Sequence, residues 1–596
     1  MDLSRALEEA MSAAVAAGAI LREDFHRPGG ARGAVDKAEA DTEAEKLIRA
    51  RLLAAFPDWR YVGEETGRAG GDGGAPVWLV DPNDGTRDYL AGRRGSAVSI
   101  GLLVEGRPAL GVVFAFAYPD DEGDFFAWAE GCGPLRRNGR AVGAALPAAL
   151  GALDVVLVSS GGDRDPETNL RCAAPARYRC VPSIAHRLAL VAAGEAAAAT
   201  SLFAPCAWDY AAGQALLRAA GGVLVDEMGS EVAYDASGMS HAARAFAAHA
   251  ALARELSARP WESALRHGGA SVERPVRLER GRAVADGALL SRAQGALMGQ
   301  VAGDSLGSLV EFESADAIRA AWPAGPRMLA DGGTWHTLAG QPTDDSEMAL
   351  ALARAIVAEG GYRSEAAFAA YREWYRSGPF DVGNTTRAAL NGYRMGESQA
   401  NGSLMRASPL GVLAHAGGPA RAAAWGREDS ALTHPHPTCG DAVAAFVVAV
   451  ADAVRHGDGR HAWNAARQWA RSASAAAPVV EALDAAESAP RQADGPNQGW
   501  VLIALQNAFH DLLHARSLEE GVVASVARGG DTDTNAAIAG ALLGAVHGRA
   551  AVPPQWRSMI LSCRSHPLRA RHPRPMAFWP VDLYELAERL LLAGES

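Results

Sequence analysis

The sequence contains few cysteines and no long apolar run, and both absences restrict the class of protein. Its six cysteines are scattered among 596 residues without a C-x-x-C pair. Neither a zinc knuckle nor a disulfide framework is therefore indicated, and a reduced, cytoplasmic compartment fits best. The longest apolar stretches, such as the one that begins at Ala442, are shorter than a membrane span. Acidic residues (Asp2, Glu8, Glu9) stand where a signal peptide requires positive charge, so we expect a soluble protein that enters no membrane.

The sequence also lacks a basic stripe. Its formal net charge is −12 and its pI is about 5.8, and the arginines are mixed with acidic residues. Proteins that bind nucleic-acid phosphates usually carry a basic patch, so the sequence indicates no nucleic-acid binding. Hydrophobic residues make up 49% and charged residues 21%, which is typical of globular domains. A length of 596 residues favours at least two domains, because single cores rarely grow past about 250–300 residues.

Residues 1–262 alternate helical and strand-like patterns, which predicts a mixed α and β domain. An amphipathic first helix is predicted from apolar residues at helical spacing, namely Leu3, Leu7, Met11 and Val15. Further helices are predicted over 47–56 and 211–222, with Gly221 or Gly222 capping the second. Short apolar runs between Gly, Pro or charged residues predict strands at 77–81, 97–104, 109–118 and 154–160.

The composition changes after residue 262. Residues 263–288 are polar and rich in Arg and Gly, so we expect a linker there. Ala-rich helical patterns dominate residues 289–596 and strand patterns nearly vanish, which predicts a mostly α domain. The clearest helical segments are 348–360, 441–457 and 535–548.

Four short acidic motifs stand out in the first half. They are DKAEADTE with Asp41, VGEE with Glu64 and Glu65, WLVDPNDGT with Asp81, Asp84 and Thr86, and WDYAAG with Asp209. Each motif alone has a structural interpretation. The first two would be solvated helix and loop charges, the third a turn after a strand, and Asp209 the N-cap of a helix.

Taken together, the four motifs favour a metal site. Asp81 ends an apolar strand, which is where ligands commonly bind in α/β folds. Carboxylates without His or Cys suit hard cations such as Mg²⁺ or Mn²⁺. Such ions can clamp a phosphate and activate a water molecule.

The series G-E-E, D-P-x-D-G-T and W-D-x-A-A-G resembles the inositol monophosphatase superfamily over about residues 5–250, a superfamily that includes 3'(2'),5'-bisphosphate nucleotidases. The resemblance implies a layered α/β sandwich of the sugar-phosphatase type. It also implies a phosphomonoesterase that uses two or three Mg²⁺ or Mn²⁺ ions. The substrate would be a small phosphorylated sugar or nucleotide, attacked by water without a phosphoenzyme.

The same resemblance assigns roles to individual residues. The metal ligands would be Glu64, Asp81, Asp84 and Asp209. The catalytic residues would be Asp41 and Thr86, which orient the water, together with Glu64. Gly85 and Thr86 would contact the substrate. The sequence departs from the usual pattern at Asn83, where most members carry an apolar residue, and at residues 87–89, so the substrate stays open.

The second half carries four further motifs. They are GALMGQVAGDSLG with Asp304, PTDDSEMA with Thr343, Asp344 and Asp345, ANGSLMRASP with Asn401, Gly402 and Ser403, and RGGDTDTNA with Asp531, Asp533 and Thr534. Structural interpretations exist here too. Asp344 and Glu347 have the spacing of a capping box, Asp533 could cap a helix, and the glycines around Asp304 could permit close helix packing.

The pairing of the motifs favours a second metal site. T-D-D and D-x-D-T each open a helix with two carboxylates and a hydroxyl group. Two such turns facing each other would form an oxygen site for two hard cations, since their four negative charges repel one another without metal.

This half resembles the ADP-ribosylglycohydrolase family, which includes the dinitrogenase reductase-activating glycohydrolases, over about residues 289–590. The motifs G-D-S-L-G, T-D-D-S, N-G-S-L-M-R, T-H-P-H and G-G-D-T-D-T-N-A occur in the family's order. The resemblance implies an all-α bundle with two Mg²⁺ or Mn²⁺ ions. The implied reaction is hydrolysis of an N- or O-glycosidic bond at C1'' of an ADP-ribosyl group.

The metal ligands implied by this second resemblance are Thr343, Asp344, Asp345, Asp531, Asp533 and Thr534. Asp304 would be catalytic, near a metal or the ribose. The substrate pocket would be lined by Asn401, Gly402, Ser403, His434, Gly529 and Gly530. A single His in a helical domain is often structural, so His434 carries little weight alone.

We therefore predict a bifunctional metal-dependent hydrolase, active as a phosphatase and as an ADP-ribosyl glycohydrolase. Its partners would be a small phosphorylated metabolite and an ADP-ribosylated protein or ADP-ribose derivative, and the resemblance to dimeric phosphatases allows a homodimer. One alternative is that one domain is active and the other is a sensor that binds ADP-ribose or phosphate without turnover. Another is a scaffold whose acids are only helix caps and solvated charges.

Overall fold

The computed structural model describes residues 1–596 except 72, 144, 262–275, 277–278 and 596. The chain divides into two compact units, Met1–Ala285 and Asp286–Ser596. Most of the predicted linker, 263–288, lies outside the described residues. Its described end packs onto the first unit, where Arg280 donates a 2.7 Å hydrogen bond from Nη2 to the carbonyl oxygen of Ala31.

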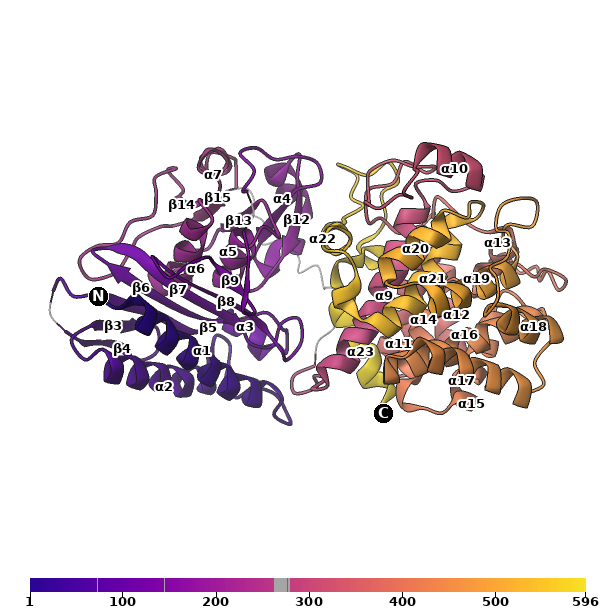
Figure 1. The fold of residues 1–596 in the computed structure, drawn as a ribbon, viewed down its shortest axis with the longest axis horizontal. Coiled ribbons are helices and arrows are strands. Elements are labelled where there is room, and N and C mark those ends of the chain that lie inside the picture. The colour runs from indigo at the N-terminus through magenta and orange to yellow at the C-terminus, as the bar shows by residue number, and fades with distance from the viewer. Residues whose placement is uncertain (72, 144, 262–275, 277–278, 596) are drawn as a thin grey trace. The chain divides into compact units, whose positions relative to one another are not determined.

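The first unit is built of alternating layers of helices and sheets (Figure 1). Its larger sheet has the strand order β10-β9-β8-β7-β6-β5-β3-β4. The strands are β3 (Arg60–Gly63), β4 (Gly67–Gly70), β5 (Val77–Asp84), β6 (Ala97–Val104), β7 (Arg107–Ala115), β8 (Asp124–Ala129), β9 (Arg136–Arg137) and β10 (Arg140–Ala141). Helices α1 (Leu3–Phe25) and α2 (Glu39–Ala55) cover one face of this sheet, with the short pair β1 (Gly33–Ala34) and β2 (Lys37–Ala38) between them in sequence.

The other face of this sheet packs against α5 (Ile184–Ala192) and α6 (Ala207–Ala219), which also contact a second sheet. That sheet has the order β12-β11-β13-β15-β14, formed by Arg177–Cys180, Val155–Val158, Ala198–Ser201, Ala245–Ala248 and Val223–Asp226. Its strands contact α4 (Pro166–Ala173) and α7 (Ala250–Ser257). The unit is thus the predicted layered α/β sandwich.

The predicted strands are confirmed: β5 and β6 contain the runs 77–81 and 97–104, while β7 and β11 overlap 109–118 and 154–160 and end two or three residues earlier. β5 and β6 are buried along almost their whole length, as expected for strands covered on both faces. The predicted helix over 47–56 is the second half of α2. The helix predicted over 211–222 is part of α6. Its C-cap residue is Ala220, and Gly221 follows with φ of +75°.

The predicted first helix is confirmed and Leu3, Leu7 and Met11 pack against the core, but Val15 does not belong to its buried face. Val15 is 53% exposed, and the fully buried face of α1 consists of small residues such as Ala10 and Ala14. Gly18 shows how close this face of α1 lies to the sheet, because a Cβ at this position would lie 2.6 Å from the ring of Phe114 on β7. Close packing on the sheet therefore selects the alanine face over the larger side chains.

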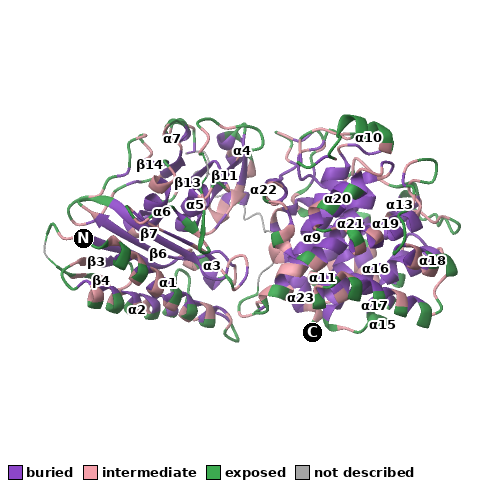
Figure 2. Cartoon of the chain, viewed as in Figure 1, coloured by how far each residue is buried: buried purple, intermediate pink, exposed green. Residues whose placement is uncertain are grey.

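The second unit is helical, and every regular element described in it is an α- or 3₁₀-helix, as predicted. Its longer helices are α9 (Gly287–Gly307), α11 (Asp344–Glu359), α12 (Ser364–Arg376), α15 (Pro419–Ala431), α16 (Pro437–His456), α17 (Gly459–Ser472), α19 (Val501–His514), α21 (Thr532–His547) and α23 (Leu583–Gly594). The shorter ones are α10 (Ala315–Ala321), α13 (Asn384–Leu390), α14 (Ser408–Leu413), α18 (Ala477–Ala485), α20 (Leu518–Val526) and α22 (Pro554–Ser562). Buried residues concentrate on α9, α16 and α21 (Figure 2).

Glycine allows α9 and α21 to lie in backbone contact. A Cβ on Gly299 would lie 2.1 Å from the carbonyl oxygen of Gly540, and one on Gly540 would lie 2.1 Å from that of Gly299. Gly303 and Gly307 continue the stripe at four-residue spacing and meet Ala536 and Asp533. The glycines therefore do permit close packing, and that packing brings the end of α9 to the start of α21.

Within the described residues, α16 alone is long and apolar enough to span a membrane by length and composition. Of its most apolar window, 83% is buried inside the unit. The helix contacts α14, α15, α17, α19 and α21, so it is a core helix of this fold.

Candidate functional sites

The carboxylates of the first site meet because β3 and β5 run parallel in register. Gly63 pairs with Val80, so the next residues, Glu64 and Asp81, lie side by side at the end of the two strands. The backbone N–H of Glu64 also donates a 3.2 Å hydrogen bond to the carbonyl oxygen of Val80. The strand pairing thus fixes the first two carboxylates of the site.

Asp84 and Asp209 join this pair from the last position of β5 and from α6. Oδ2 of Asp84 accepts hydrogen bonds from Ser183 Oγ at 2.6 Å and from the backbone N–H of Ala185 at 2.7 Å, at the start of α5. Asp209 lies in the first turn of α6. It is the N3 residue and not the N-cap, which is Cys206, and its Oδ2 accepts from the Cys206 N–H at 2.8 Å.

Asp41 is held by two donors from the third motif. Asn83 Nδ2 donates to Asp41 Oδ1 at 2.9 Å, and Thr86 Oγ1 lies 3.1 Å from Asp41 Oδ2. Thr86 begins α3 (Thr86–Leu90), and Gly85 precedes it with φ of +101°, a conformation that favours glycine. The structure thus brings Asp41 and Thr86 together, and Gly85 serves as the turn that positions Thr86.

Burial dominates the electrostatics of this site. It raises the pKa of Asp81 and Asp209 well above their usual range, and mutual repulsion with the neighbouring carboxylates adds to the effect. The pKa values of Glu64 and Asp84 are raised for the same first reason. Burial raises the pKa of Asp41 to about 7, although the bonds from Asn83 and Thr86 oppose the shift. A cation would relieve this crowding of negative charge.

Two supporting residues were not predicted from the sequence. The buried carboxylate of Glu45 accepts from the backbone N–H groups of Glu65 at 2.7 Å and Thr66 at 2.8 Å, which holds the turn that carries Glu64. Ser183 caps α5 and orients Asp84. Neither belongs to an acidic motif, and both act across 20 or more positions, so no local pattern marks them.

The second site forms where α9 ends and α11 begins. Thr343 Oγ1 lies 2.9 Å from Asp304 Oδ1 and 3.0 Å from Asp345 Oδ2. The backbone N–H groups of Thr343 and Ser346 donate to Asp304 at 3.1 to 3.2 Å. Asp304 is fully buried, so it lies at the floor of the cluster.

The first turn of α21 supplies the opposite wall. Single carboxylate oxygens of Asp304, Asp345 and Asp533 all lie within 4.8 Å of one another. Asp531 is the N-cap residue of α21, and its Oδ2 accepts from Asn401 Nδ2 at 2.7 Å. Thr534 is buried beside them. The structure thus brings the T-D-D and D-x-D-T turns together.

Two further carboxylates, Glu311 and Asp381, belong to this cluster and were not predicted. Each offers an oxygen within 4.8 Å of one on Asp533 and of one another. Glu311 Oε2 accepts from Trp335 Nε1 at 2.6 Å. Both residues lie in irregular segments, Glu311 after α9 and Asp381 between α12 and α13, so no helix or strand pattern marks them.

Burial again raises the pKa values of the second site. The pKa of Asp304 rises to about 7 and that of Glu311 to about 8, while those of Asp344, Asp345 and Asp533 rise well above their usual range. Asp345 Oδ1 is buried without a hydrogen-bond donor among the described residues. An unpaired buried oxygen amid crowded carboxylates fits a hard cation.

The alternative interpretation of Asp344 and Asp533 as helix caps is wrong. The N-cap of α11 is Thr343, and no capping box forms between Asp344 and Glu347. Glu347 is instead buried against the guanidinium of Arg574, with Arg574 Nε 2.8 Å from Glu347 Oε1. A partner more than two hundred positions away thus replaces the local cap.

The predicted pocket residues divide into two groups. A cavity of about 530 Å³ has Gln399, Gly499 and Trp500 in its wall, and Asn401 lies beside it because its N–H donates to the carbonyl oxygen of Gly499 at 3.0 Å. Ser403 and His434 are buried below Gly402.

The second group makes contacts inside the domain and consists of Ser403, His434, Gly529 and Gly530. Ser403 Oγ lies 2.9 Å from Ser430 Oγ. Burial, with the charge of Arg406, lowers the pKa of His434 to about 3, so the ring is neutral. Gly529 and Gly530 have φ of +72° and +78°. The N–H of Gly530 donates to the carbonyl oxygen of Glu313 at 2.8 Å, so these glycines form a packed turn before α21.

Family models match both halves of the chain. The model described as ADP-ribosylglycohydrolase matches residues 285–595, and the model described as inositol monophosphatase family matches residues 2–260. Among curated relatives, the chain is similar to ADP-ribosyl-[dinitrogen reductase] glycohydrolase of Rhodospirillum rubrum. The identity is 31% over 279 residues, which are 45% of this chain and 90% of that protein.

The first half is similar to inositol monophosphatase 3 of Solanum lycopersicum, with 31% identity over 239 residues, or 38% of this chain and 87% of that protein. A solved inositol monophosphatase from Anabaena (Nostoc) aligns with 25% identity and a TM-score of 0.36, covering 43% of this chain and 95% of that one. The chain therefore belongs to two hydrolase families at once, to the inositol monophosphatase family through residues 2–260 and to the ADP-ribosylglycohydrolase family through residues 285–595.

Proposed function

We propose that the chain is a bifunctional metal-dependent hydrolase, with a phosphomonoesterase in the first unit and an ADP-ribosyl glycohydrolase in the second. The observation that carries the proposal is that each unit gathers its motif carboxylates into one cluster with a buried centre, formed by Asp41 and Asp81 in the first unit and by Asp304, Asp344, Asp345 and Asp533 in the second. Buried carboxylates at such spacing are costly without a cation, which indicates metal sites and not helix caps. Both families consist of metal-dependent enzymes for which Mg²⁺ is typical.

In the first unit, Glu64, Asp81, Asp84 and Asp209 would hold two or three Mg²⁺ or Mn²⁺ ions. When bound, these ions would neutralise the phosphate and lower the pKa of water. Asp41 takes the proton of the attacking water at Oδ2, and the Thr86 hydroxyl orients that water. The oxygen of water bonds to phosphorus while the bond from phosphorus to the ester oxygen breaks, and the departing oxygen takes a proton from solvent to leave as an alcohol.

In the second unit, two ions would be held by Thr343, Asp344, Asp345, Asp531, Asp533 and Thr534. The ions would bind and orient the ribose hydroxyls of the substrate. Water adds to ribose C1'' as the glycosidic bond breaks, and its proton passes to the departing nitrogen or oxygen, while carboxylate oxygens of the site would stabilise the positive charge that develops at C1''. Asp304, at the floor of the cluster, positions Thr343 and the start of α11.

The cavity beside Asn401 suits the remainder of an ADP-ribosyl group. Trp500 forms part of its wall, and the Arg491 guanidinium lies 4.9 Å from the centre of the Trp500 ring. An aromatic ring offers a stacking surface for a nucleobase, and Arg491 offers charge for phosphates. The substrates would be a small phosphorylated metabolite and an ADP-ribosylated protein or ADP-ribose derivative, and we place the enzyme in the cytoplasm on its cysteine content alone.

The test measures phosphate release and ADP-ribose release by the full chain with Mg²⁺ or Mn²⁺. The panel holds inositol phosphate, 3'-phosphoadenosine 5'-phosphate, NADP, ADP-ribose-1''-phosphate and ADP-ribosylated peptides. Asp81→Asn should abolish only phosphate release and Asp344→Asn only ADP-ribose release, so each variant is the control for the other. A wild type that binds ADP-ribose but turns over nothing would replace the proposal with a sensor function.

A further inference from the structure

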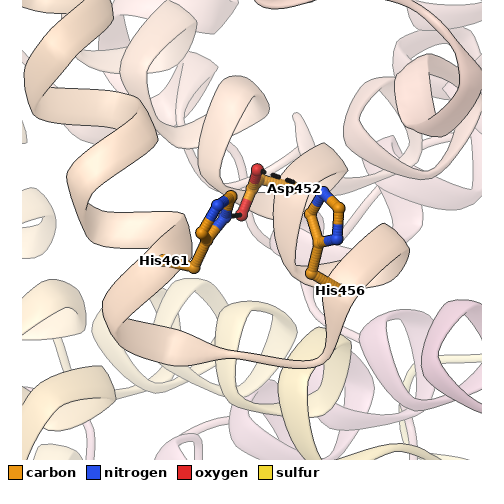
Figure 3. Close-up of side chains that lie close together, drawn as sticks. All are labelled: Asp452, His456 and His461. Carbon is orange, nitrogen blue, oxygen red and sulfur yellow. Dashed lines mark hydrogen bonds and ion pairs between the residues drawn. The ribbon is translucent and has the colours of Figure 1, made fainter.

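A cluster of one carboxylate and two imidazoles lies at the far end of α16 from the candidate active site. Asp452 and His456 stand one turn apart on α16, and His461 lies in the first turn of α17 (Figure 3). One ligand atom from each residue lies within 4.8 Å of the others. None of the three belongs to a motif of either family.

The turn between the helices brings His461 back over Asp452. Gly457 ends α16 with φ of +67°, the left-handed conformation that terminates a helix. Asp458 then caps α17, and its Oδ1 accepts from the backbone N–H of His461 at 2.8 Å. Both ends of the turn are thereby fixed, so the position of the His461 ring depends on the fold and not on a free loop.

The distances within the cluster suit shared coordination. His461 Nδ1 lies 2.6 Å from Asp452 Oδ1, and His456 Nε2 lies 3.9 Å from Asp452 Oδ2. Ligand atoms of one tetrahedral zinc are about 3.4 Å apart, given bonds of about 2.0–2.2 Å. An ion could therefore bind if His461 Nδ1 and Asp452 Oδ1 moved apart by less than about 1 Å, from 2.6 Å to about 3.4 Å. The two rings lie edge to face with centroids 4.8 Å apart and planes at 60°, on either side of the Asp452 carboxylate (Figure 3).

We propose that Asp452, His456 and His461 form a surface site for a divalent transition metal, Zn²⁺ above all. Imidazole nitrogen distinguishes this site from the two carboxylate clusters, because it favours Zn²⁺, Ni²⁺ or Cu²⁺ over Mg²⁺. The side chains of His456 and His461 are 44% and 59% exposed, so water can complete the coordination. Asp452 is the anchor, with only 16% of its side chain exposed.

The site is separate from the candidate dimetal centre. Residue 436, at the start of α16, is 16 positions before Asp452, which corresponds to about 24 Å of helix. The ion would join the last turn of α16 to the first turn of α17 and so hold this helical hairpin together. Buried Trp463, two positions after His461, would report the change by fluorescence.

The test adds one equivalent of Cu²⁺ to the full chain in saturating Mg²⁺ and records electron paramagnetic resonance. Imidazole coordination produces nitrogen couplings, which the oxygen ligands of the active sites cannot produce. We expect the couplings in the wild type and their loss in the double variant His456→Ala/His461→Ala. Zn²⁺ titration by calorimetry should show one equivalent fewer in the double variant, or an affinity reduced by more than about tenfold.

The matched control is a second surface pair, His510 and His514, one turn apart on α19 with ring centroids 4.4 Å apart. Both of these rings are engaged by carbonyl oxygens, of Ala486 and Glu487. His510→Ala/His514→Ala should keep the couplings and the Zn²⁺ equivalent. The proposal is overturned if the couplings persist in His456→Ala/His461→Ala, if the control removes them equally, or if the wild type shows none.

Discussion

Asn83 Nδ2 donates a 2.9 Å hydrogen bond to Oδ1 of Asp41, across 42 positions of sequence. The backbone N–H of Asn83 also donates to Asp81 Oδ1 at 2.8 Å, so one residue connects the carboxylate proposed to take the proton to one proposed to bind metal. The bond from Asn83 therefore favours the charged form of Asp41.

Asn83→Leu should shift the acid limb of the phosphatase pH profile upward by about one pH unit, because a hydrogen bond to a carboxylate is worth about 1.5–3 kcal/mol. Burial raises the pKa of Asp41 to about 7, and the hydrogen bond from Asn83 opposes this rise. Loss of the bond should therefore raise the pKa further. Initial rates of phosphate release between pH 5 and 9 measure the shift. ADP-ribose release by the same variant is the internal control, and an unmoved phosphatase profile would refute the role of Asn83.

Removal of metal should make stability fall as pH rises. The pKa values of Asp304 and Glu311 are raised to about 7 and about 8, whereas unfolded carboxyls titrate near 4. Between these pH values the folded state binds more protons than the unfolded state, so the free energy of unfolding decreases with pH. In EDTA we expect a lower Tm at pH 8 than at pH 5.5, by roughly 2–4 °C for each kcal/mol lost.

Mg²⁺ should reverse this loss, and reverse it more at pH 8, where protons no longer compete for the carboxylates. Differential scanning calorimetry with EDTA or Mg²⁺ at both pH values makes the measurement. Asp345→Asn removes one buried charge and should reduce the pH dependence of the second unit only. Equal Mg²⁺ effects at both pH values would contradict the buried-carboxylate account.

The glycine contact between α9 and α21 should be intolerant of a methyl group. Gly299→Ala would place a Cβ 2.1 Å from the carbonyl oxygen of Gly540, and backbone cannot move aside cheaply. We expect a loss of about 1–3 kcal/mol in the free energy of unfolding and a lower affinity for Mg²⁺, because Asp304 and Asp533 would separate. Gly361→Ala is the control, since nothing lies within 4 Å of its Cβ. Chemical denaturation of both variants tests the difference, and equal stabilities would exclude the contact as a constraint.

Most of the site was predictable because its residues stand at the ends of regular elements. Asp81 follows the apolar run 77–80 within β5, and Asp344 and Asp533 lie in the first turns of helices, so the local pattern and the metal chemistry indicate the same residues. Glu311 and Asp381 were not predictable, because irregular segments bring them to the cluster through tertiary packing alone. The same reason explains the exposed Val15, since the sheet accepts the small face of α1.

Glu347 is the clearest case in which a distant partner overrides a local pattern, and its pair gives a further prediction. The side chains of Glu347 and Arg574 are each 1% exposed, and Trp374 Nε1 adds a 2.8 Å hydrogen bond to Glu347 Oε2. Removal of the guanidinium would leave a buried carboxylate without its charge partner. Arg574→Met should therefore lower the free energy of unfolding by about 3–5 kcal/mol.

The exposed pair of Arg363 and Glu359 is the matched control, with side chains 67% and 44% exposed. Arg363→Met should cost only about 0–1 kcal/mol, because water screens that pair. Arg574→Met/Glu347→Met should recover much of the loss, since an apolar pair leaves no buried charge. Urea denaturation of the three variants decides the matter. If Arg574→Met were no more destabilising than Arg363→Met, the buried pair would not be what anchors the start of α11 behind Asp344.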